Sequence, residues 1–148
     1  MSMARIRLLL ATLWVGSLWT VGYIVAPTLF ATLADRTLAG TIAGSIFHTE
    51  AWVSLVSGLI LLLLMFLNRG ANERLRKQLL GLIVAMLACT AVGYFGLQPY
   101  MAALKDAAGS AGLAAAGTSM QFAWLHGIAS IIFLLQSLLG IGLILKLR

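Results

Sequence analysis

Four long runs without a charged side chain divide the sequence. They cover residues 8–34, 51–68, 78–104 and 107–145. A helix rises about 1.5 Å per residue and the hydrocarbon core of a bilayer is about 30 Å thick, so about 20 apolar residues cross it. Each run holds one such stretch. We therefore predict four transmembrane helices, at about 7–27, 48–67, 79–98 and 124–145.

The apolar positions do not alternate with polar ones, as they would in the strands of a membrane barrel. The segment 59–67 is apolar on every face of a helix, which is typical of a helix surrounded by lipid or protein. These patterns predict an all-α integral membrane protein. In this prediction residues 1–148 form a single transmembrane domain, a four-helix bundle.

The composition agrees with a membrane protein. Apolar residues make up 61% of the 148 residues and charged residues only 9%, whereas soluble domains have about 45–50% and about 25%. So few charges cannot cover a water-facing surface, which excludes a soluble globular domain and a disordered chain. The single cysteine, Cys89, excludes an intramolecular disulfide scaffold. The partner of the apolar surface is therefore the lipid bilayer.

Arg5 and Arg7 before an apolar run would also suit a secretory signal peptide. The apolar region of such a signal is usually about 7–15 residues long. The run here continues to residue 34, and no Ala-x-Ala cleavage site follows it closely. We expect an uncleaved first helix.

The basic residues predict the orientation. Eight of the ten Lys and Arg residues fall at the N-terminus, between the second and third spans, or at the C-terminus. Because cytoplasmic loops are enriched in Lys and Arg, we expect an N-in/C-in protein of the bacterial cytoplasmic (inner) membrane. The connections 28–47 and 99–123 would then lie outside. This bias and contact with anionic headgroups account for the net charge of +6, so we expect no nucleic-acid partner.

The first outer connection has the composition of a structured segment. Asp35 is a suitable N-cap, so the second helix should begin near Arg36 and extend beyond the bilayer on the outer side. Gly40, Gly44 and His48 would then recur along one face of this helix.

Two further segments raise the question of whether the chain is helical there. Thr49 and Glu50 are compatible either with a continuous second helix or with a break in it. Residues 107–119 are nearly all small, which predicts a mobile loop.

No ionisable residue lies near the middle of a predicted span. Proton- and ion-coupled transporters usually need such residues, so transport of a small solute is not favoured. Counting about 20 residues from the basic anchors places the polar side chains at one level instead, near the outer interface. These are His48, Glu50, Gln98, Tyr100, Met101, Met120, Gln121 and His126, with Trp52 and Trp124 as an aromatic belt.

The two histidines at this level suggest a metal or haem site. Imidazole suits copper, zinc and haem iron, and a thioether suits Cu(I). The ligands would be His126 and His48, with Glu50, Met101 or Met120 as an auxiliary ligand. The alternative is that both histidines hydrogen-bond neighbouring helices or water. No metal-binding motif of the H-x-x-x-H or C-x-x-C type decides between the two.

Two segments carry a resemblance to a known family. They are Trp14-Val-Gly16 with Ala26-Pro-Thr-Leu-Phe30 and 39–47, and Phe122-Ala-Trp-Leu-His-Gly127 with Ser130. Together they resemble the transmembrane-protein-205-like family, whose bacterial members form domain-of-unknown-function family 4149. The resemblance extends over essentially the whole chain and implies a four-helix inner-membrane protein.

Such proteins are also distantly similar to the copper-resistance D membrane domain and to HemJ-type protoporphyrinogen oxidases. That similarity implies copper or porphyrin handling and a role for His126. The HemJ-type proteins have a further histidine in the first helix, and the first helix here has none.

The leading functional hypothesis is a non-enzymatic membrane protein that acts through contacts between helices or with a partner. The sequence holds no nucleophile–base pair and no phosphate-binding glycine loop. Gly40, Gly44 and Pro27 would form the contact surface together with the two histidines, and the partner would be a second copy or another membrane protein. The alternative hypothesis is copper, other metal or haem binding at the periplasmic interface through His126 and His48.

Overall fold

The structure is a computed structural model that describes residues 2–67, 72–109 and 117–148. In these residues, four helical rods are long and apolar enough to cross a membrane. The rods are Met3–Thr32, Arg36–Leu67, Glu73–Ala108 and Ser119–Leu147. The expected all-α, four-helix fold class is therefore confirmed, and each predicted span lies inside one rod.

The first and third rods each contain a π-helical segment. The first consists of α1 (Met3–Trp19), η1 (Thr20–Val25) and α2 (Ala26–Thr32). The third consists of α4 (Glu73–Thr90), η2 (Ala91–Leu97) and α5 (Gln98–Ala108). The second and fourth rods are the unbroken helices α3 (Arg36–Leu67) and α7 (Ser119–Leu147).

A proline near the end of each π-helical segment accounts for the change in helix geometry. Pro27 and Pro99 stand in the first turn of the α-helix that follows. A proline inside a helix has no N–H to donate, and its ring clashes with the carbonyl four residues earlier. Widening the preceding turn relieves this clash, so the rod continues across the membrane instead of ending.

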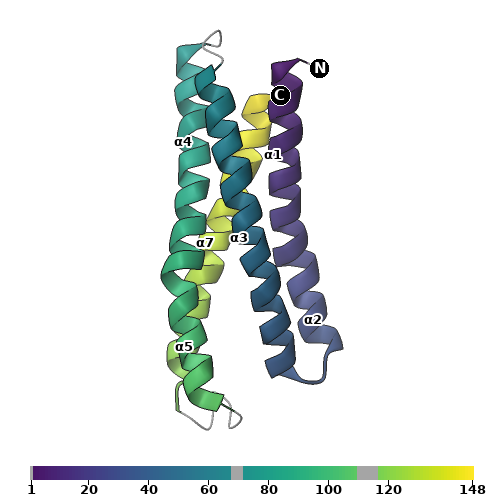
Figure 1. The fold of residues 1–148 in the computed structure, drawn as a ribbon, viewed down its shortest axis with the longest axis vertical. Helices are drawn as coiled ribbons and strands as arrows, with labels where there is room; N and C mark the ends of the chain where they lie inside the picture. Colours follow the sequence, from purple (N-terminus) through teal and green to yellow (C-terminus); the bar gives the residue numbers. More distant parts are fainter. Residues whose placement is uncertain (1, 68–71, 110–116) are drawn as a thin grey trace.

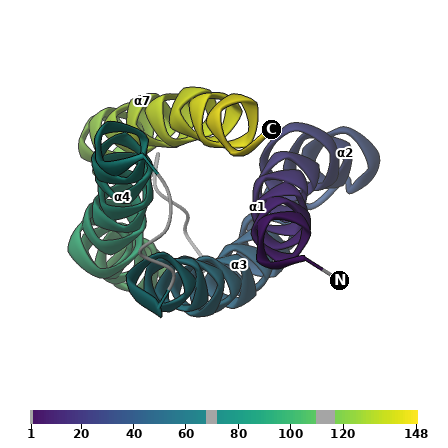
Figure 2. The ribbon, with the colours of Figure 1, turned by 90° about the horizontal axis from the view of Figure 1, so that it is seen from above.

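The rods run alternately up and down, so both ends of the chain lie at the same end of the bundle (Figure 1). Seen along the bundle, the rods form a ring in the order α1, α3, α4 and α7 (Figure 2). Contacts join each rod to its neighbours, and α7 closes the ring against α1. The helices α3 and α7 therefore lie diagonally across the bundle.

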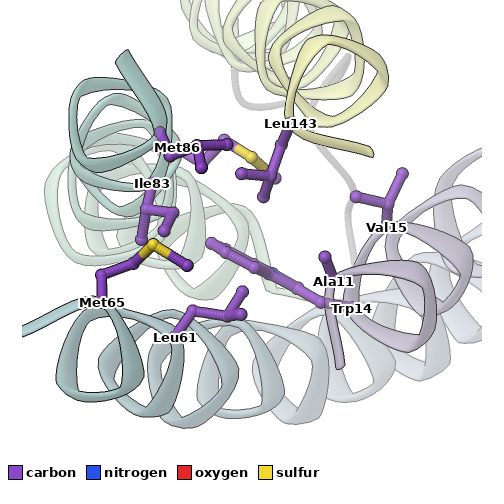
Figure 3. Packing of buried hydrophobic residues seen from close by; sticks show 9 residues of the cluster. Ala11, Trp14, Val15, Leu61, Met65, Ile83, Met86 and Leu143 are labelled. Atoms are coloured by element: carbon purple, nitrogen blue, oxygen red, sulfur yellow. The ribbon is translucent and has the colours of Figure 1, made fainter. Parts of the chain in front are cut away.

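The half of the bundle beside the termini has a closely packed core. All four rods contribute to it, and their side chains converge on the bundle axis (Figure 3). Its buried residues are Ala11, Trp14, Val15, Leu61, Met65, Leu79, Ile83, Met86 and Leu143. A Cβ at Gly140 would lie only 2.9 Å from Cγ2 of Val15. The helix α7 can approach α1 this closely because position 140 has no side chain.

Asp35 begins α3 as expected. Its Oδ1 accepts hydrogen bonds from the backbone N–H groups of Thr37 (2.8 Å) and Leu38 (3.1 Å). This N-cap satisfies two amides that have no partner within the helix. The helix then continues through Thr49 and Glu50, so the alternative of a break there is wrong.

Both outer connections are shorter than predicted. The first rod continues past its predicted span to Thr32, and residues 33–35 join it to α3, which begins at Arg36 as expected. In the second connection, residues 99–108 belong to α5. Pro99 does not prevent this, because it occupies the first helical turn, where proline is tolerated.

The helix α5 ends at Gly109, whose positive φ of 51° suits a residue without a side chain. The chain re-enters helix at Ser119. Most of the predicted mobile loop at 107–119 lies outside the described residues, which resume at Gly117.

Candidate functional site

A cavity of about 790 Å³ lies between the four rods. Its lining comes from residues 18–30, 40–54, 89–105 and 122–136. Each of these segments begins near the middle of its rod and extends toward the end of the bundle opposite the termini, which we call the far end. The bundle is therefore packed in one half and hollow in the other.

Four polar side chains form the inner boundary of the cavity, where the hollow half meets the packed core. We call them the floor: Glu50, Ser54, Thr90 and Gln136. All four are buried, with exposed fractions between 1% for Ser54 and 6% for Glu50 and Thr90. Burying polar groups in an apolar bundle is costly unless they are hydrogen-bonded.

Glu50 is held by neighbours on two rods. The hydroxyl groups of Ser17 and Ser54 donate to its Oε1, at 3.2 Å and 3.3 Å, and Ser17 shares its hydrogen with the carbonyl oxygen of Trp14 at 2.9 Å. Ser54 Oγ in turn accepts a hydrogen bond from Trp14 Nε1 at 2.8 Å. This network ties the carboxyl group of Glu50 to the packed core through Trp14.

The other side of the floor is a second polar pair. Gln136 Nε2 donates to Thr90 Oγ1 at 3.0 Å, and the Thr90 hydroxyl donates to the carbonyl oxygen of Met86 at 3.3 Å. Because the single hydroxyl hydrogen of Thr90 is used on Met86, its oxygen must accept from Gln136. The amide nitrogen of Gln136 therefore faces Thr90.

The burial of Glu50 was not anticipated by the sequence analysis. We expected this residue among polar side chains at the outer interface and no ionisable residue near the middle of a spanning helix. Glu50 lies near the midpoint of the 32-residue helix α3, and its side chain is buried in the bundle. The count from the basic anchors gives a level along the helix but not the face that turns inward, and that face is determined by packing against other rods.

Lys105 lies at the far end of the cavity. It belongs to α5, and its Nζ is 3.4 Å from the place that a Cβ on Gly40 of α3 would occupy. The same Nζ lies 5.3 Å from the centroid of the Phe122 ring on α7, a cation–π contact. The ammonium group therefore lies beside two other rods, at the opposite end of the cavity from the floor.

The glycine face of α3 points toward α5 and η2. Gly40 faces Lys105, and a Cβ at Gly44 would lie 3.7 Å from Gln98 Nε2. His48, one turn further along, is hydrogen-bonded through Nδ1 to the Tyr94 hydroxyl. The spacing of 40, 44 and 48 thus predicted a shared face, and that face lies against the third rod.

The two histidines have different surroundings. His48 is exposed and belongs to an aromatic cluster, with its ring 6.5 Å from that of Trp52 and 5.3 Å from that of Tyr94. His126 lines the cavity and stacks on Phe122 at 6.1 Å, with the rings nearly parallel. Among the described residues no interaction joins the two histidines. His48 is not part of the cavity lining, whereas Glu50 and His126 both are.

The expected auxiliary ligands are also separated. Met101 is buried and lines the cavity, as does Gln98, but Met120 is 72% exposed. Tyr100 and Gln121 are exposed as well. Within the part of the chain that the structure describes, no three His, Cys, Asp or Glu side chains come together as a metal site.

Aromatic rings form one wall of the cavity. Phe133 on α7 meets Tyr23 edge to face at 5.5 Å and Phe47 on α3 at 6.0 Å. Its ring occupies the space that a side chain at Gly22 would need. The Tyr23 hydroxyl donates to Ser137 Oγ at 3.1 Å, which links η1 to α7.

The sequence analysis missed a short internal repeat in this wall. Val-Gly-Tyr occurs at 21–23 and again at 92–94, each time shortly before a proline. Both copies lie in the π-helical segments and line the cavity through glycine and tyrosine. Each tyrosine hydroxyl binds another rod, Tyr23 to α7 and Tyr94 to α3. A comparison of the sequence with itself would have found this signal.

A family model for DUF4149, a domain of unknown function, matches residues 9–110. The chain belongs to the DUF4149 family. This match includes the first rod from residue 9 onward and the whole of the second and third rods, and with them Glu50, both Val-Gly-Tyr segments and Lys105. It ends before α7, so the segment 122–130 that carried half of the resemblance lies outside it. Neither the curated proteins nor the solved structures that were compared with the chain gave a match.

Proposed function

We propose that this DUF4149 protein binds an amphiphilic small molecule, taken up from the membrane, in the cavity between its rods. The observation that carries the proposal is the cavity itself, about 790 Å³ in volume and with a buried carboxyl group in its floor. Pockets for small molecules typically measure about 300–1,000 Å³ and combine apolar walls with a few well-placed polar groups.

The energetics of packing support an occupant. Side chains that line an empty apolar space lose the dispersion contacts they would make in a filled one. The lining here includes the rings of Phe30, Phe47 and Phe133, which would regain such contacts from an apolar molecule. The proposal involves binding without chemical conversion.

Gly44 provides a direct test. A Cβ at this position makes only an ordinary contact with Gln98, so the side chain of Gly44→Leu would enter the cavity without a backbone clash. The purified chain in phosphatidylcholine nanodiscs should bind the neutral fluorophore 1-aminoanthracene saturably. Gly44→Leu should weaken that binding by about tenfold or more, because the leucine occupies the volume the fluorophore needs.

The matched control is Gly81→Leu. Within the described residues no atom lies within 4 Å of a Cβ at Gly81, so the leucine faces outward and binding should not change. Absence of saturable binding by the original chain would overturn the proposed function. Equal binding by the Gly44→Leu variant would do the same.

We also propose that the chain is a single transmembrane domain of the bacterial cytoplasmic membrane with both termini in the cytoplasm. The position of both termini at one end of the bundle supports this proposal (Figure 1). Basic residues gather at that end, where Lys146 Nζ donates to Gln78 Oε1 at 2.8 Å. The far end of the cavity would then face the outer leaflet.

Contact with a second copy or another membrane protein is a separate proposal. Gly40, Gly44 and Pro27, which we expected on the contact surface, line the cavity instead. A partner would therefore have to meet the outward apolar faces of the rods. Size-exclusion chromatography in a mild detergent tests this proposal, and a bare monomer would count against it.

Metal or haem binding is the alternative function. One observation favours it, namely that His126 and Glu50 line the same cavity. The test is an optical spectrum and an elemental analysis of the purified protein, repeated with His126→Ala. A Soret band or a stoichiometric metal that disappears in the variant would support the alternative, and absence of both in the original chain would exclude it.

A further inference from the structure

The floor of the cavity offers acceptor oxygens without matching donors. Both hydroxyl groups that reach Glu50 donate to Oε1, and no described residue donates to Oε2. In Gln136, the amide nitrogen is used on Thr90, and its Oε1 likewise receives no hydrogen bond from a described residue. These two oxygens belong to side chains that are 94% and 96% buried, with exposed fractions of 6% and 4%.

The two free oxygens are accessible from the cavity. Among the described residues, every fully enclosed side-chain nitrogen or oxygen has a hydrogen-bond partner. Glu50 Oε2 and Gln136 Oε1 have none, so they are not fully enclosed, and both residues line the cavity. A molecule in the cavity can therefore donate hydrogen bonds to them.

Glu50 also has no positive partner in the described part of the chain. The ion pair that the structure records there joins Lys77 to Glu73, near the end of the bundle that holds the termini. The cation among the described cavity residues is Lys105, which lies beside Gly40 at the far end. Ten residues of α3 separate Gly40 from Glu50, which is about 15 Å along a helix. No cation among the described residues therefore neutralises the carboxyl group, and a cationic ligand could do so.

The neighbouring wall suits an organic cation. Phe47 lies one helical turn before Glu50 on α3, and both side chains line the cavity. Phe133 and Tyr23 continue this wall through their edge-to-face contacts. The faces of aromatic rings attract ammonium groups, most strongly where water is excluded. A metal ion would need several ligands at one point, whereas an ammonium group needs only acceptors and an apolar surrounding.

We propose that the floor binds the protonated amino group of a lipophilic amine. The ammonium group would donate to Glu50 Oε2 and Gln136 Oε1, since a primary ammonium has three N–H donors. The apolar body would lie along the aromatic wall and extend toward Lys105, so that the two positive charges lie at opposite ends of the cavity. This inference rests on the proposed function and adds the chemical class of the ligand.

The test compares decylamine with decanol, which share an apolar chain and differ in the charged group. Each competes with 1-aminoanthracene for the purified chain in phosphatidylcholine nanodiscs. The two competitors are compared at equal concentration in the bilayer. An alkyl ammonium is charged at neutral pH, and hydrogen bonds to a charged group are stronger than neutral ones. Decylamine should therefore displace the fluorophore at a concentration about tenfold lower than decanol.

Glu50→Gln is the informative variant. The glutamine keeps the size of the side chain and an oxygen that can accept from Ser17 and Ser54, but it has no negative charge. The tenfold preference for decylamine should fall to about equal displacement, while the Gly81→Leu control should keep the preference. An unchanged preference in Glu50→Gln would overturn the inference.

A second measurement does not depend on the folding of the variant. In the original chain, decanoate should compete least well, because its carboxylate would meet the carboxyl group of Glu50. Equal displacement by decylamine, decanol and decanoate would overturn the ammonium site. Saturable fluorophore binding that Gly44→Leu weakens would still support the proposed function, so the two failures can be told apart.

Discussion

Ser54 connects the packed core to the cavity floor through two hydrogen bonds. Its oxygen accepts from Trp14 Nε1 and its hydroxyl donates to Glu50. Ser54→Ala would leave a buried indole N–H without its acceptor and the carboxyl group with one donor fewer. We expect a loss of about 1–3 kcal/mol in unfolding free energy, measured by thermal or denaturant unfolding in detergent.

Thr12→Ala is the control for this prediction. Thr12 is exposed, and its hydroxyl donates to the carbonyl oxygen of Leu8 within the same helix. Its loss should change the unfolding free energy by less than about 0.5 kcal/mol. If Ser54→Ala were no less stable than Thr12→Ala, the network around Glu50 would not contribute to folding.

At the residue scale, the sequence predicted which residues share a helix face but not which of them are buried. The spacing of Gly40, Gly44 and His48 was sufficient to place them on one face of a helix. Their partners on the third rod could not be predicted, because they depend on which rods are neighbours in the ring. The burial of Glu50 was missed for a related reason. It depends on which face of α3 turns inward, and contacts with other rods decide that.

The contact between η1 and α7 depends on a glycine. The Phe133 ring packs against Gly22 and is held on two sides by Tyr23 and Phe47. A methyl group at position 22 would overlap this ring, so the ring would have to shift and lose its edge-to-face contacts with Tyr23 and Phe47. Gly22→Ala should therefore destabilise the protein by about 1–3 kcal/mol through overpacking, measured as the midpoint and free energy of unfolding.

Gly16→Ala is the matched control on the same rod. No atom of the described residues lies within 4 Å of a Cβ at Gly16, so alanine should be neutral or stabilising by up to about 1 kcal/mol. The double variant Gly22→Ala with Phe133→Leu should recover part of the loss, because the smaller side chain leaves room. Additive effects of the two substitutions would show that the ring contact is not the cause.

At the element scale, the rods could be predicted because their length and apolarity are local properties of the sequence. The cap at Asp35 was predicted for the same reason, since its hydrogen bonds reach only Thr37 and Leu38. The helix α5 was not predicted, because Pro99 and the small residues after it are also typical of a loop. Its helical geometry is supported by contacts with α7, which are distant in the sequence.

At the scale of the whole molecule, the division into a packed and a hollow half was not predictable from composition. Apolar residues line both halves. The difference arises where the rods approach one another closely, as α7 and α1 do at Gly140, and where polar and aromatic side chains keep them apart. The distance between two neighbouring rods depends on all the contacts within the ring and not on one local stretch of sequence. The cavity therefore became visible only in the three-dimensional structure.

The orientation of the bundle determines from which side the cavity could be filled. Both termini lie at the packed end, and the far end includes the 33–35 connection (Figure 1). If the basic residues direct that packed end to the cytoplasm, green fluorescent protein fused after Arg148 should fluoresce, and alkaline phosphatase fused there should be inactive. Phosphatase inserted after Leu33 should be active, because that enzyme folds only outside the cytoplasm. The opposite pattern would show that the far end faces the cytoplasm, and the ligand would then come from the cytoplasmic leaflet.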